Sequence, residues 1–256
     1  MQKQNDMPPG IKIDNLSFSY NPGKEILRNL SLEIRAGEKY GIIGPSGSGK
    51  STLLLHLNGV LKGEGSITIG DTEVNEKNLA KIRRMVGLVF QNPDDQLFNP
   101  TVEEDVAFGP LNFGFTPEEV KARVEKALSD MNLTGFEKLT SHHLSFGERK
   151  RVALATVLAL QPEVIAFDEP FSNLDPSMVH QLMNRIRSMK TTLVLVSQSI
   201  LPLISICDRM GIIRDGRLIA SGPPKEIAGD RELMRSSGLD LEFYCKICSD
   251  LNSTDI

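Results

Sequence analysis

Cysteine is scarce in this chain, which has three cysteines in 256 residues. Cys207 stands alone, while Cys245 and Cys248 form a single CxxC pair near the C-terminus. So few thiols exclude a disulfide framework and fit a reducing cytosol. A zinc site at the CxxC would need two further ligands, and no second CxxC or nearby histidine supplies them. A metal or redox role for this pair is therefore the less favoured alternative.

Long apolar runs and an excess of positive charge are also missing. The most apolar stretch, Val152 to Leu160, is far shorter than the roughly 20 residues that a membrane-spanning helix needs. The start, MQKQNDMPPG, has no apolar core of the kind found in signal peptides. We therefore expect any link to a membrane to run through a partner. The net charge of −4 gives no sign of a nucleic-acid partner, which would favour a basic face.

What is present is an alternation of short apolar runs with helical patterns. The runs YGIIG, VGLVF, VIAF and LVLV have the length and composition of buried strands. Strands that alternate with helices predict an α/β fold with a largely parallel sheet. The alternating segments IKIDNLSFSY, LSLEI and GSITIG predict an added antiparallel β layer, and IIRDGRLIAS predicts a hairpin with a type I′ turn at Asp215-Gly216.

The middle of the chain has a different, helical character. Thr116 and Glu119 form a capping box with Pro117 at the first helical position, and a second helix is expected from about Gly147 to Leu160. We expect a helical subdomain inserted into the α/β core. The predicted divisions are an α/β core in two parts (1–91 and 161–224), the helical subdomain (92–160) and a C-terminal tail (225–256).

The segment GPSGSGKS, at positions 44–51, matches the phosphate-loop pattern G-x-x-x-x-G-K-[ST]. It follows a predicted strand and opens a predicted helix, as the mechanism requires. Backbone N–H groups of such a loop point at phosphate oxygens, and the helix adds its positive end. Lys50 would pair with the β- and γ-phosphates, and the Ser51 hydroxyl would bind Mg²⁺.

Asp168 and Glu169 follow the buried run VIAF, where α/β folds bind their ligands. An acidic pair in this position is, alone, more often the solvated start of a loop. Together with the phosphate loop it predicts that Asp168 holds Mg²⁺, directly or through water. Glu169 would polarise the attacking water as a general base.

The chain at this point resembles the ABC ATPases over nearly its whole length. The motif Leu144-Ser145-Phe146-Gly147-Glu148 is similar to the LSGGQ signature of that family, with Phe146 and Glu148 in place of Gly and Gln. The resemblance implies a P-loop NTPase fold that binds ATP and Mg²⁺, and a dimer in which Ser145 and Gly147 meet the ATP of the opposite subunit. Alone, LSFGE would more often be an ordinary helix N-cap.

Other motifs of the family follow in the expected order along the chain. Gln91 resembles the Q-loop residue, which touches Mg²⁺ and relays to the membrane partner, and SNLD at 172–175 resembles the D-loop at the dimer seam. Tyr20 lies where the family has an aromatic ring against adenine, although a single Tyr is more often plain packing. The expected nucleotide-binding residues are therefore Tyr20, Gly44, Pro45, Ser46, Gly47, Ser48, Gly49, Lys50, Ser51, Thr52, Gln91, Ser145 and Gly147, with Ser51, Gln91 and Asp168 at the metal.

The sequence departs from the family at Gln198, which occupies the place of the usual histidine after the last core strand. A neutral amide can touch a γ-phosphate or orient water, but it cannot become positively charged. Gln198 is expected to share the catalytic site with Glu169 and to give slower hydrolysis than a histidine would. Pairing with a different ATPase subunit that tolerates the asymmetry is the second hypothesis.

The run QNPDDQLF at 91–98 and TVEEDVAFGP at 101–110 resembles the ATPases of energy-coupling-factor importers, including cobalt and nickel systems. This resemblance implies a homodimer or heterodimer of ATPases at the cytoplasmic face of the membrane. Its partners would be an integral membrane coupling protein and a substrate-binding membrane protein that takes up a vitamin or metal ion. Asp94 and Asp95 would meet arginines of the coupling protein, or would simply form a solvated turn.

Two other functions stay open. A non-transport ABC ATPase is disfavoured because the chain has neither a long coiled-coil insertion nor a second cassette. A weakly hydrolysing regulatory subunit is suggested by Phe146 and Gln198. The transported substrate and the identity of the second ATPase lie beyond what this sequence specifies.

Overall fold

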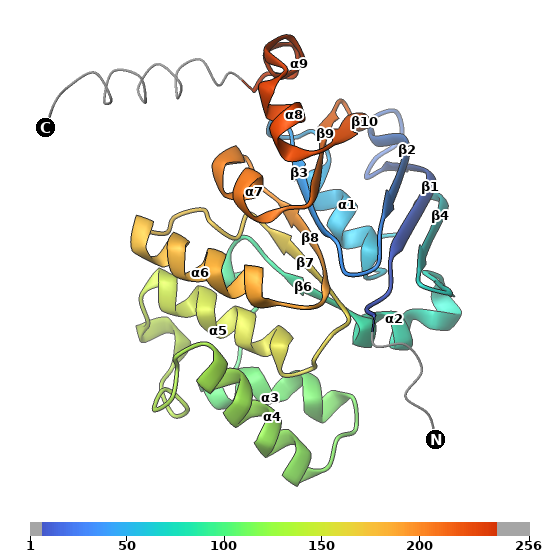
Figure 1. Cartoon of the computed structure of the whole chain (residues 1–256). Coiled ribbons are helices and arrows are strands. Elements are labelled where there is room, and N and C mark those ends of the chain that lie inside the picture. Colours follow the sequence, from blue (N-terminus) through green and yellow to red (C-terminus); the bar gives the residue numbers. More distant parts are fainter. Residues whose placement is uncertain (1–6, 240–256) are drawn as a thin grey trace, which may run out of the picture.

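The computed structural model describes residues 7–239, which form two sheets surrounded by helices (Figure 1). The larger sheet has six strands, five of them parallel, and β10 runs antiparallel to β9 at one edge. In sheet order the strands are β10 (Arg217–Gly222), β9 (Arg209–Arg214), β3 (Lys39–Ile43), β8 (Thr192–Val196), β7 (Val164–Asp168) and β6 (Val86–Val89). The α/β fold with a largely parallel sheet is confirmed.

The smaller sheet is the expected antiparallel layer. Its order is β2 (Glu25–Ile34), β1 (Ile11–Ser19), β4 (Glu64–Ile69) and β5 (Thr72–Glu73). Helix α1 (Lys50–Leu57) shares a buried core with residues of both sheets. Helix α1 therefore lies between the two sheets, and the loop that leads into it from β3 begins at the carboxyl edge of the large sheet.

The central strands of the large sheet are buried on both faces, which explains their unbroken apolar sequences. In β8 the side chains of Leu193 and Leu195 pack into the core under the long helices, while Val194 and Val196 pack into the core around α1. Successive side chains of a strand point to opposite faces, so β8 contributes side chains to both hydrophobic cores.

The helices between β6 and β7 are gathered on one side of the large sheet (Figure 1). They are α3 (Val102–Asn112), α4 (Pro117–Asp130) and α5 (Phe146–Leu158). Each begins with a capping box, at Thr101/Glu104, Thr116/Glu119 and Ser145/Glu148. The box of α4 was predicted, whereas those of α3 and α5 were not. The loop QNPDDQLFNP contains one 3₁₀ turn, Pro93–Asp95.

Five further helices of residues 7–239 complete the fold. These are α2 (Leu79–Met85), α6 (Pro176–Ser188), α7 (Ile200–Ile206), α8 (Pro224–Gly229) and α9 (Arg231–Ser236), with 3₁₀ turns at Glu76–Asn78 and Ser141–His143. Helix α6 lies beside α5 (Figure 1). The hairpin between β9 and β10 is confirmed, with φ of 49° at Asp215 and 77° at Gly216, the positive values that a type I′ turn requires.

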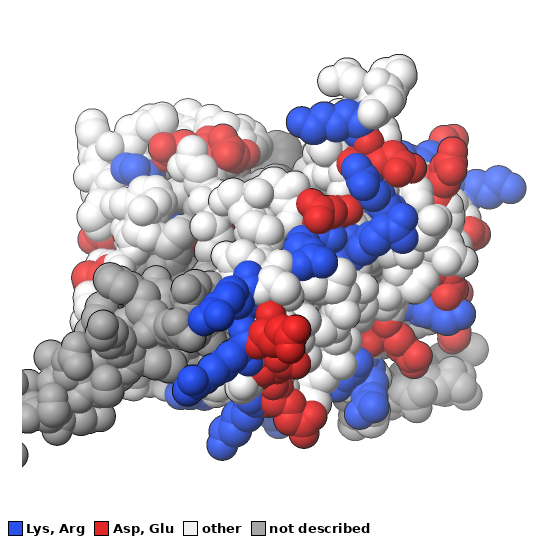
Figure 2. Space-filling view, turned by 90° about the horizontal axis from the view of Figure 1, so that it is seen from above, with Lys and Arg blue, Asp and Glu red and all other residues white. Residues whose placement is uncertain are grey.

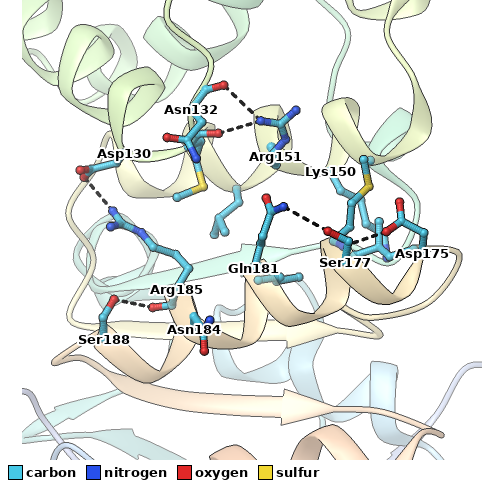
Figure 3. Close-up of a pocket in the computed structure, with 16 residues that line it drawn as sticks. Asp130, Asn132, Lys150, Arg151, Asp175, Ser177, Gln181, Asn184, Arg185 and Ser188 are labelled. Carbon is cyan, nitrogen blue, oxygen red and sulfur yellow. Dashed lines mark hydrogen bonds and ion pairs between the residues drawn. The ribbon is translucent and has the colours of Figure 1, made fainter.

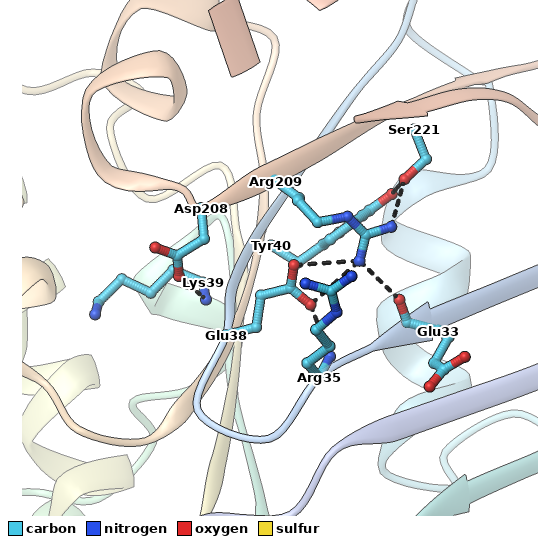
Figure 4. Close-up of polar contacts among 8 residues, drawn as sticks. All are labelled: Glu33, Arg35, Glu38, Lys39, Tyr40, Asp208, Arg209 and Ser221. Atoms are coloured by element: carbon cyan, nitrogen blue, oxygen red, sulfur yellow. Dashed lines mark hydrogen bonds and ion pairs between the residues drawn. The ribbon is translucent and has the colours of Figure 1, made fainter. Parts of the chain in front are cut away.

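A polar cluster ties the β2–β3 turn to the edge hairpin (Figure 4). The Glu38 carboxylate accepts from the Arg35 N–H at 2.7 Å and from the Arg209 guanidinium at 3.2 Å. The buried Tyr40 hydroxyl lies 2.7 Å from the Ser221 hydroxyl. These partly buried bonds connect β9 and β10 to β3 and to the turn before it.

Among residues 7–239, no helix is long and apolar enough to cross a bilayer. Cys207 is buried, and burial raises the pKa of its thiol to about 12. Cys245 and Cys248 lie outside the described residues. In Figure 2, acidic and basic side chains lie interspersed over the face drawn, so the described residues there form no patch of one sign.

Candidate functional site

The phosphate-loop segment connects β3 to α1, and its backbone lies against neighbouring strands. At Gly44, with φ of +156°, an added Cβ would lie 2.1 Å from the Ile213 carbonyl oxygen. At Gly49, with φ of +102°, it would meet Leu27 at 2.8 Å. Glycine is therefore required at both ends of the loop, because a side chain at either position would push the loop away from β2 and β9.

The first turn of α1 presents free backbone donors. Its N-cap is Gly49, which offers no side-chain hydrogen bond, and no acidic residue lies in the first turn. Helices α3, α4 and α5 instead satisfy these donors with their capping boxes. Unsatisfied N–H groups and the positive end of the helix dipole suit the start of α1 to bind phosphate.

Lys50 is buried at this loop, with its side-chain nitrogen 2.8 Å from the Gly44 carbonyl oxygen and 2.9 Å from that of Pro45. Burial lowers the pKa of Lys50, and the nearby carboxylates of Glu169 and Asp168 partly oppose that change. The ammonium therefore lies inside the loop and close to the acidic pair. A phosphate group bound here would replace one of these carbonyl oxygens as the hydrogen-bond partner of the Lys50 ammonium.

Asp168 ends β7, and Glu169 follows it with a left-handed φ of 46°. Both side chains are buried, and burial raises the pKa of each carboxyl. The Ser51 hydroxyl bonds to Asp168, and the Ser197 hydroxyl donates to Glu169 Oε2 at 3.2 Å. Asp168 Oδ1 and Glu169 Oε1 have no hydrogen-bond partner among the described residues. Paired buried oxygens with free acceptor sites fit Mg²⁺ and a water molecule.

Tyr20 lies beside the helix that follows the phosphate loop. Its hydroxyl is 3.4 Å from the Thr52 hydroxyl, and its ring packs edge-on against Phe18 at 4.9 Å. The side chain is 55% exposed, so much of the ring is available for stacking. This geometry is compatible with a base-stacking role as well as with packing against Phe18.

Gln91 follows β6 and is exposed, while Gln96 organises the segment behind it. The Gln96 amide donates to the Ala153 carbonyl and to the Thr156 hydroxyl, both at 2.7 Å, and its oxygen accepts from the Phe90 N–H at 3.2 Å. These bonds connect the Gln91 segment to α5. Sequence analysis assigned no role to Gln96, because nothing in the local run DDQLF distinguishes it from other polar loop residues.

Asp94 pairs with Arg149 of α5 at 3.1 Å, and Asp95 is exposed. The expectation that both acids meet a partner's arginines stays a prediction. Asp94 has a cationic partner within the chain, although its side chain is still 49% exposed.

Ser145 and Gly147 lie at the start of α5, apart from the phosphate loop. No hydrogen bond among residues 7–239 joins either one to that loop. Ser145 caps α5, and the Cβ that an alanine would add at Gly147 would lie 2.3 Å from Met178 Sδ of α6. The phosphate loop, Tyr20, the acidic pair and Gln198 thus form one cluster, whereas the signature-like residues form another.

Gln198 adjoins Glu169, because its backbone N–H donates to the Glu169 carboxylate. Its side chain is exposed and lines a hollow of about 340 Å³ with Gly44, Pro45 and Ser46. Met234 and Leu239 line the same hollow. The segment after residue 225, which sequence analysis left unexplained, therefore reaches the edge of the phosphate loop.

A family model described as ABC transporter matches residues 27–172. The chain is 41% identical over 251 residues to the energy-coupling factor transporter ATP-binding protein EcfA of Methanocaldococcus jannaschii, which covers 96% of this chain and 90% of that protein. A protein of the same name from Methanothermobacter thermautotrophicus is 43% identical, with 90% of this chain and 76% of that protein covered.

The chain belongs to the ABC transporter ATPases.

Solved structures agree with this assignment. The fold matches cbiO1 of Clostridium perfringens, part of the ABC transporter complex cbiONQ, with a TM-score of 0.79 and 33% identity over 93% of this chain and 98% of that one. It also matches a dimeric ATP-binding cassette bound to ADP and Pi, with a TM-score of 0.76, 29% identity, and 84% and 98% coverage. As an ABC ATPase, this chain is an enzyme that hydrolyses ATP.

Proposed function

We propose that this ABC ATPase powers an energy-coupling-factor importer of a vitamin or transition-metal ion at the cytoplasmic face of a membrane. The observation that carries the proposal is the identity of about two residues in five with EcfA proteins across almost the whole chain. The likeness to cbiO1, a component of a transporter complex, supports the same subtype.

The geometry supports specific roles at the ATP site. The free N–H groups at the start of α1 and the Lys50 ammonium hold the β- and γ-phosphates, and the Tyr20 ring stacks on adenine. Ser51 and Asp168 would hold Mg²⁺, with Gln91 as the further ligand that the sequence resemblance implies, and the ion would neutralise charge on the phosphates. Glu169 accepts a proton from the water that attacks the γ-phosphorus, and its raised pKa makes it a better base.

The separation of the two clusters supports a two-chain site. Ser145 and Gly147 would complete the ATP site of a second ATPase, either an identical chain or a relative. The match to a dimeric cassette bound to ADP and Pi is consistent with that arrangement.

An apolar surface next to the Gln91 segment supports docking to a coupling protein. Phe98 and Phe108 are 64% and 45% exposed and pack edge-on at 4.9 Å, and Leu111 of α3 is 58% exposed. Exposed aromatic pairs are typical of protein interfaces. Asp95 adds an acidic group that can meet a cation of the partner, as the sequence resemblance implies.

The decisive experiment is purification of the tagged chain from detergent-solubilised native membranes. Recovery of an integral membrane protein, with or without a second ATPase, supports the importer, and its small-molecule-binding companion identifies the cargo. The Phe98→Ala/Phe108→Ala variant should lose the membrane protein and keep ATP binding. Val60→Ala, at another exposed apolar position, is the control. Recovery of soluble partners alone would instead indicate a non-transport ABC ATPase.

Gln198 favours a second candidate, a weakly hydrolysing regulatory subunit of a heterodimer. Its uncharged side chain lines the hollow beside Gly44, Pro45 and Ser46, where a histidine would offer a charge. Turnover of the purified dimer separates the two candidates, because a regulatory subunit would bind ATP with little hydrolysis.

A further inference from the structure

Lys150 of α5 is a buried lysine whose ammonium is bound by the chain's own catalytic turn. It donates to the carbonyl oxygens of Glu169 and Pro170, both at 3.1 Å, and to that of Ser172 at 2.7 Å. It also reaches the Ser172 hydroxyl at 3.1 Å. The side chain is 9% exposed. Burying an ammonium is unfavourable unless its donors are satisfied, and here several acceptors surround it.

The turn that Lys150 holds contains the candidate general base. Glu169 has a φ of 46°, a conformation that costs a residue with a side chain about 1–3 kcal/mol and persists only where the surroundings enforce it. The Glu169 carbonyl oxygen receives a second bond from the Ser172 hydroxyl at 2.9 Å. Lys150 and Ser172 together therefore keep the backbone of Glu169 in place, and with it the direction of the carboxylate.

An open groove of about 770 Å³ lies between α5 and α6 (Figure 3). At one end of the groove Arg185 of α6 pairs with Asp130 at the end of α4, at 3.0 Å. Lys150 lies toward the other end, close to Asp175 (Figure 3). Lys150 therefore forms a buried polar connection between α5, in the helical subdomain, and the turn that follows β7.

The same helix carries Ser145 at its first turn, five residues before Lys150. A helix is stiff over so short a distance, so a shift of its N-terminus also moves the Lys150 ammonium. We propose that Lys150 is a positioning residue. When Ser145 binds the ATP held by the partner chain, the shift of α5 moves the Lys150 ammonium, and this sets the position of Glu169 in its own chain. ATP bound in one site would thereby set the general base of the other. This inference rests on the two-chain site described above.

The test is steady-state ATP hydrolysis by the purified chain, measured across ATP concentrations. Lys150→Met keeps the length of the side chain and removes the donors. We expect its kcat to fall by about 10- to 100-fold, the loss typical of a misplaced catalytic group, with a KM within about three-fold of the wild type. Lys150→Gln, which keeps amide donors, should regain part of kcat. Lys121→Met, at an exposed lysine of α4, is the matched control.

Two double-mutant cycles distinguish positioning from simple stabilisation. With Glu169→Gln, the Lys150→Met change should cost little further turnover, because the base on which it acts is gone. With Ser145→Ala, the combined loss should be smaller than the product of the single losses. Unchanged kcat in Lys150→Met, a KM that rises as much as kcat falls, or multiplicative losses in either cycle would overturn the proposal.

These results are separable from the importer proposal. The double-mutant cycles compare the kcat of ATP hydrolysis among variants of one chain, so their outcome is independent of which membrane protein the chain binds. Failure to recover a coupling protein would leave the Lys150 result standing, and the converse also holds.

Discussion

The Ser145 hydroxyl donates to Glu148 Oε2 at 2.7 Å, and the Glu148 N–H returns a bond to the same hydroxyl at 3.3 Å. The carboxylate also accepts from the Ser145 N–H at 2.8 Å. These bonds lower the pKa of Glu148, so the group is ionised at neutral pH. The first turn of the signature-like helix therefore carries a negative charge beside the hydroxyl proposed to meet a phosphate.

Glu148→Gln should strengthen the response to ATP. Glutamine keeps the capping box but removes a charge that repels phosphate. A charge at a helix start is worth about 0.3–1 kcal/mol, so we expect the ATP concentration for half-maximal turnover to fall about two- to five-fold. Glu119→Gln, in the equivalent box of α4, is the matched control. An unchanged or higher half-maximal concentration would contradict the proposed contact.

Glu169→Gln should abolish most turnover while leaving ATP bound. A positioned general base contributes about 10²–10⁴-fold to the rate, and glutamine cannot accept the proton. Single-turnover hydrolysis and binding of a fluorescent ATP analogue measure the two properties separately. Exposed Glu163, changed to Gln, should behave as the wild type. Full activity in Glu169→Gln would show that another group is the base.

Gln198→His should raise kcat. The residue adjoins Glu169, and an imidazole there can carry a positive charge toward the γ-phosphate, which an amide cannot. The gain should diminish at high pH as the imidazole loses its proton. Ser199→His, one residue further along, is the control and should leave kcat unchanged. No change or a loss in Gln198→His would argue against slow hydrolysis caused by the glutamine.

Gly147→Ala would place a Cβ 2.3 Å from Met178 Sδ, which is the end of a flexible side chain that lines the groove and can move aside. We therefore expect a loss of only about 1 kcal/mol in the free energy of unfolding, the low end of the cost of overpacking, which denaturant titration measures. Adding Met178→Ala should restore stability by vacating the space. We expect turnover to stay low in that double variant, because the proposed two-chain site needs a glycine at position 147 to bring the backbone close to the partner's ATP. Recovery of turnover together with stability would limit Gly147 to packing.

Local chemistry made several features predictable. The phosphate loop, the buried strands, the α4 capping box and the Asp215-Gly216 turn each depend on residues within a few positions of one another. Helices α3 and α7 were not predicted as helices, and each contains a proline, Pro110 or Pro202. Pro110 lies inside α3, where proline is disfavoured, but burial of neighbouring apolar side chains in the core outweighs that preference. Pro202 is the third residue of α7, in the first turn, where a missing N–H breaks no helical hydrogen bond.

The sequence by itself located the glycine-rich loop, the lysine and the two acids of the candidate nucleotide site, because each of these motifs is contained in a short segment. Only the tertiary structure decided that strands β9, β3, β8 and β7 lie in that order and that Lys150 holds Glu169. It likewise decided that the Gln96 amide donates a hydrogen bond to α5 and that Asp94 forms an ion pair with Arg149. These contacts join residues distant in sequence, and local periodicity carries no information about partners that meet only when the core has formed.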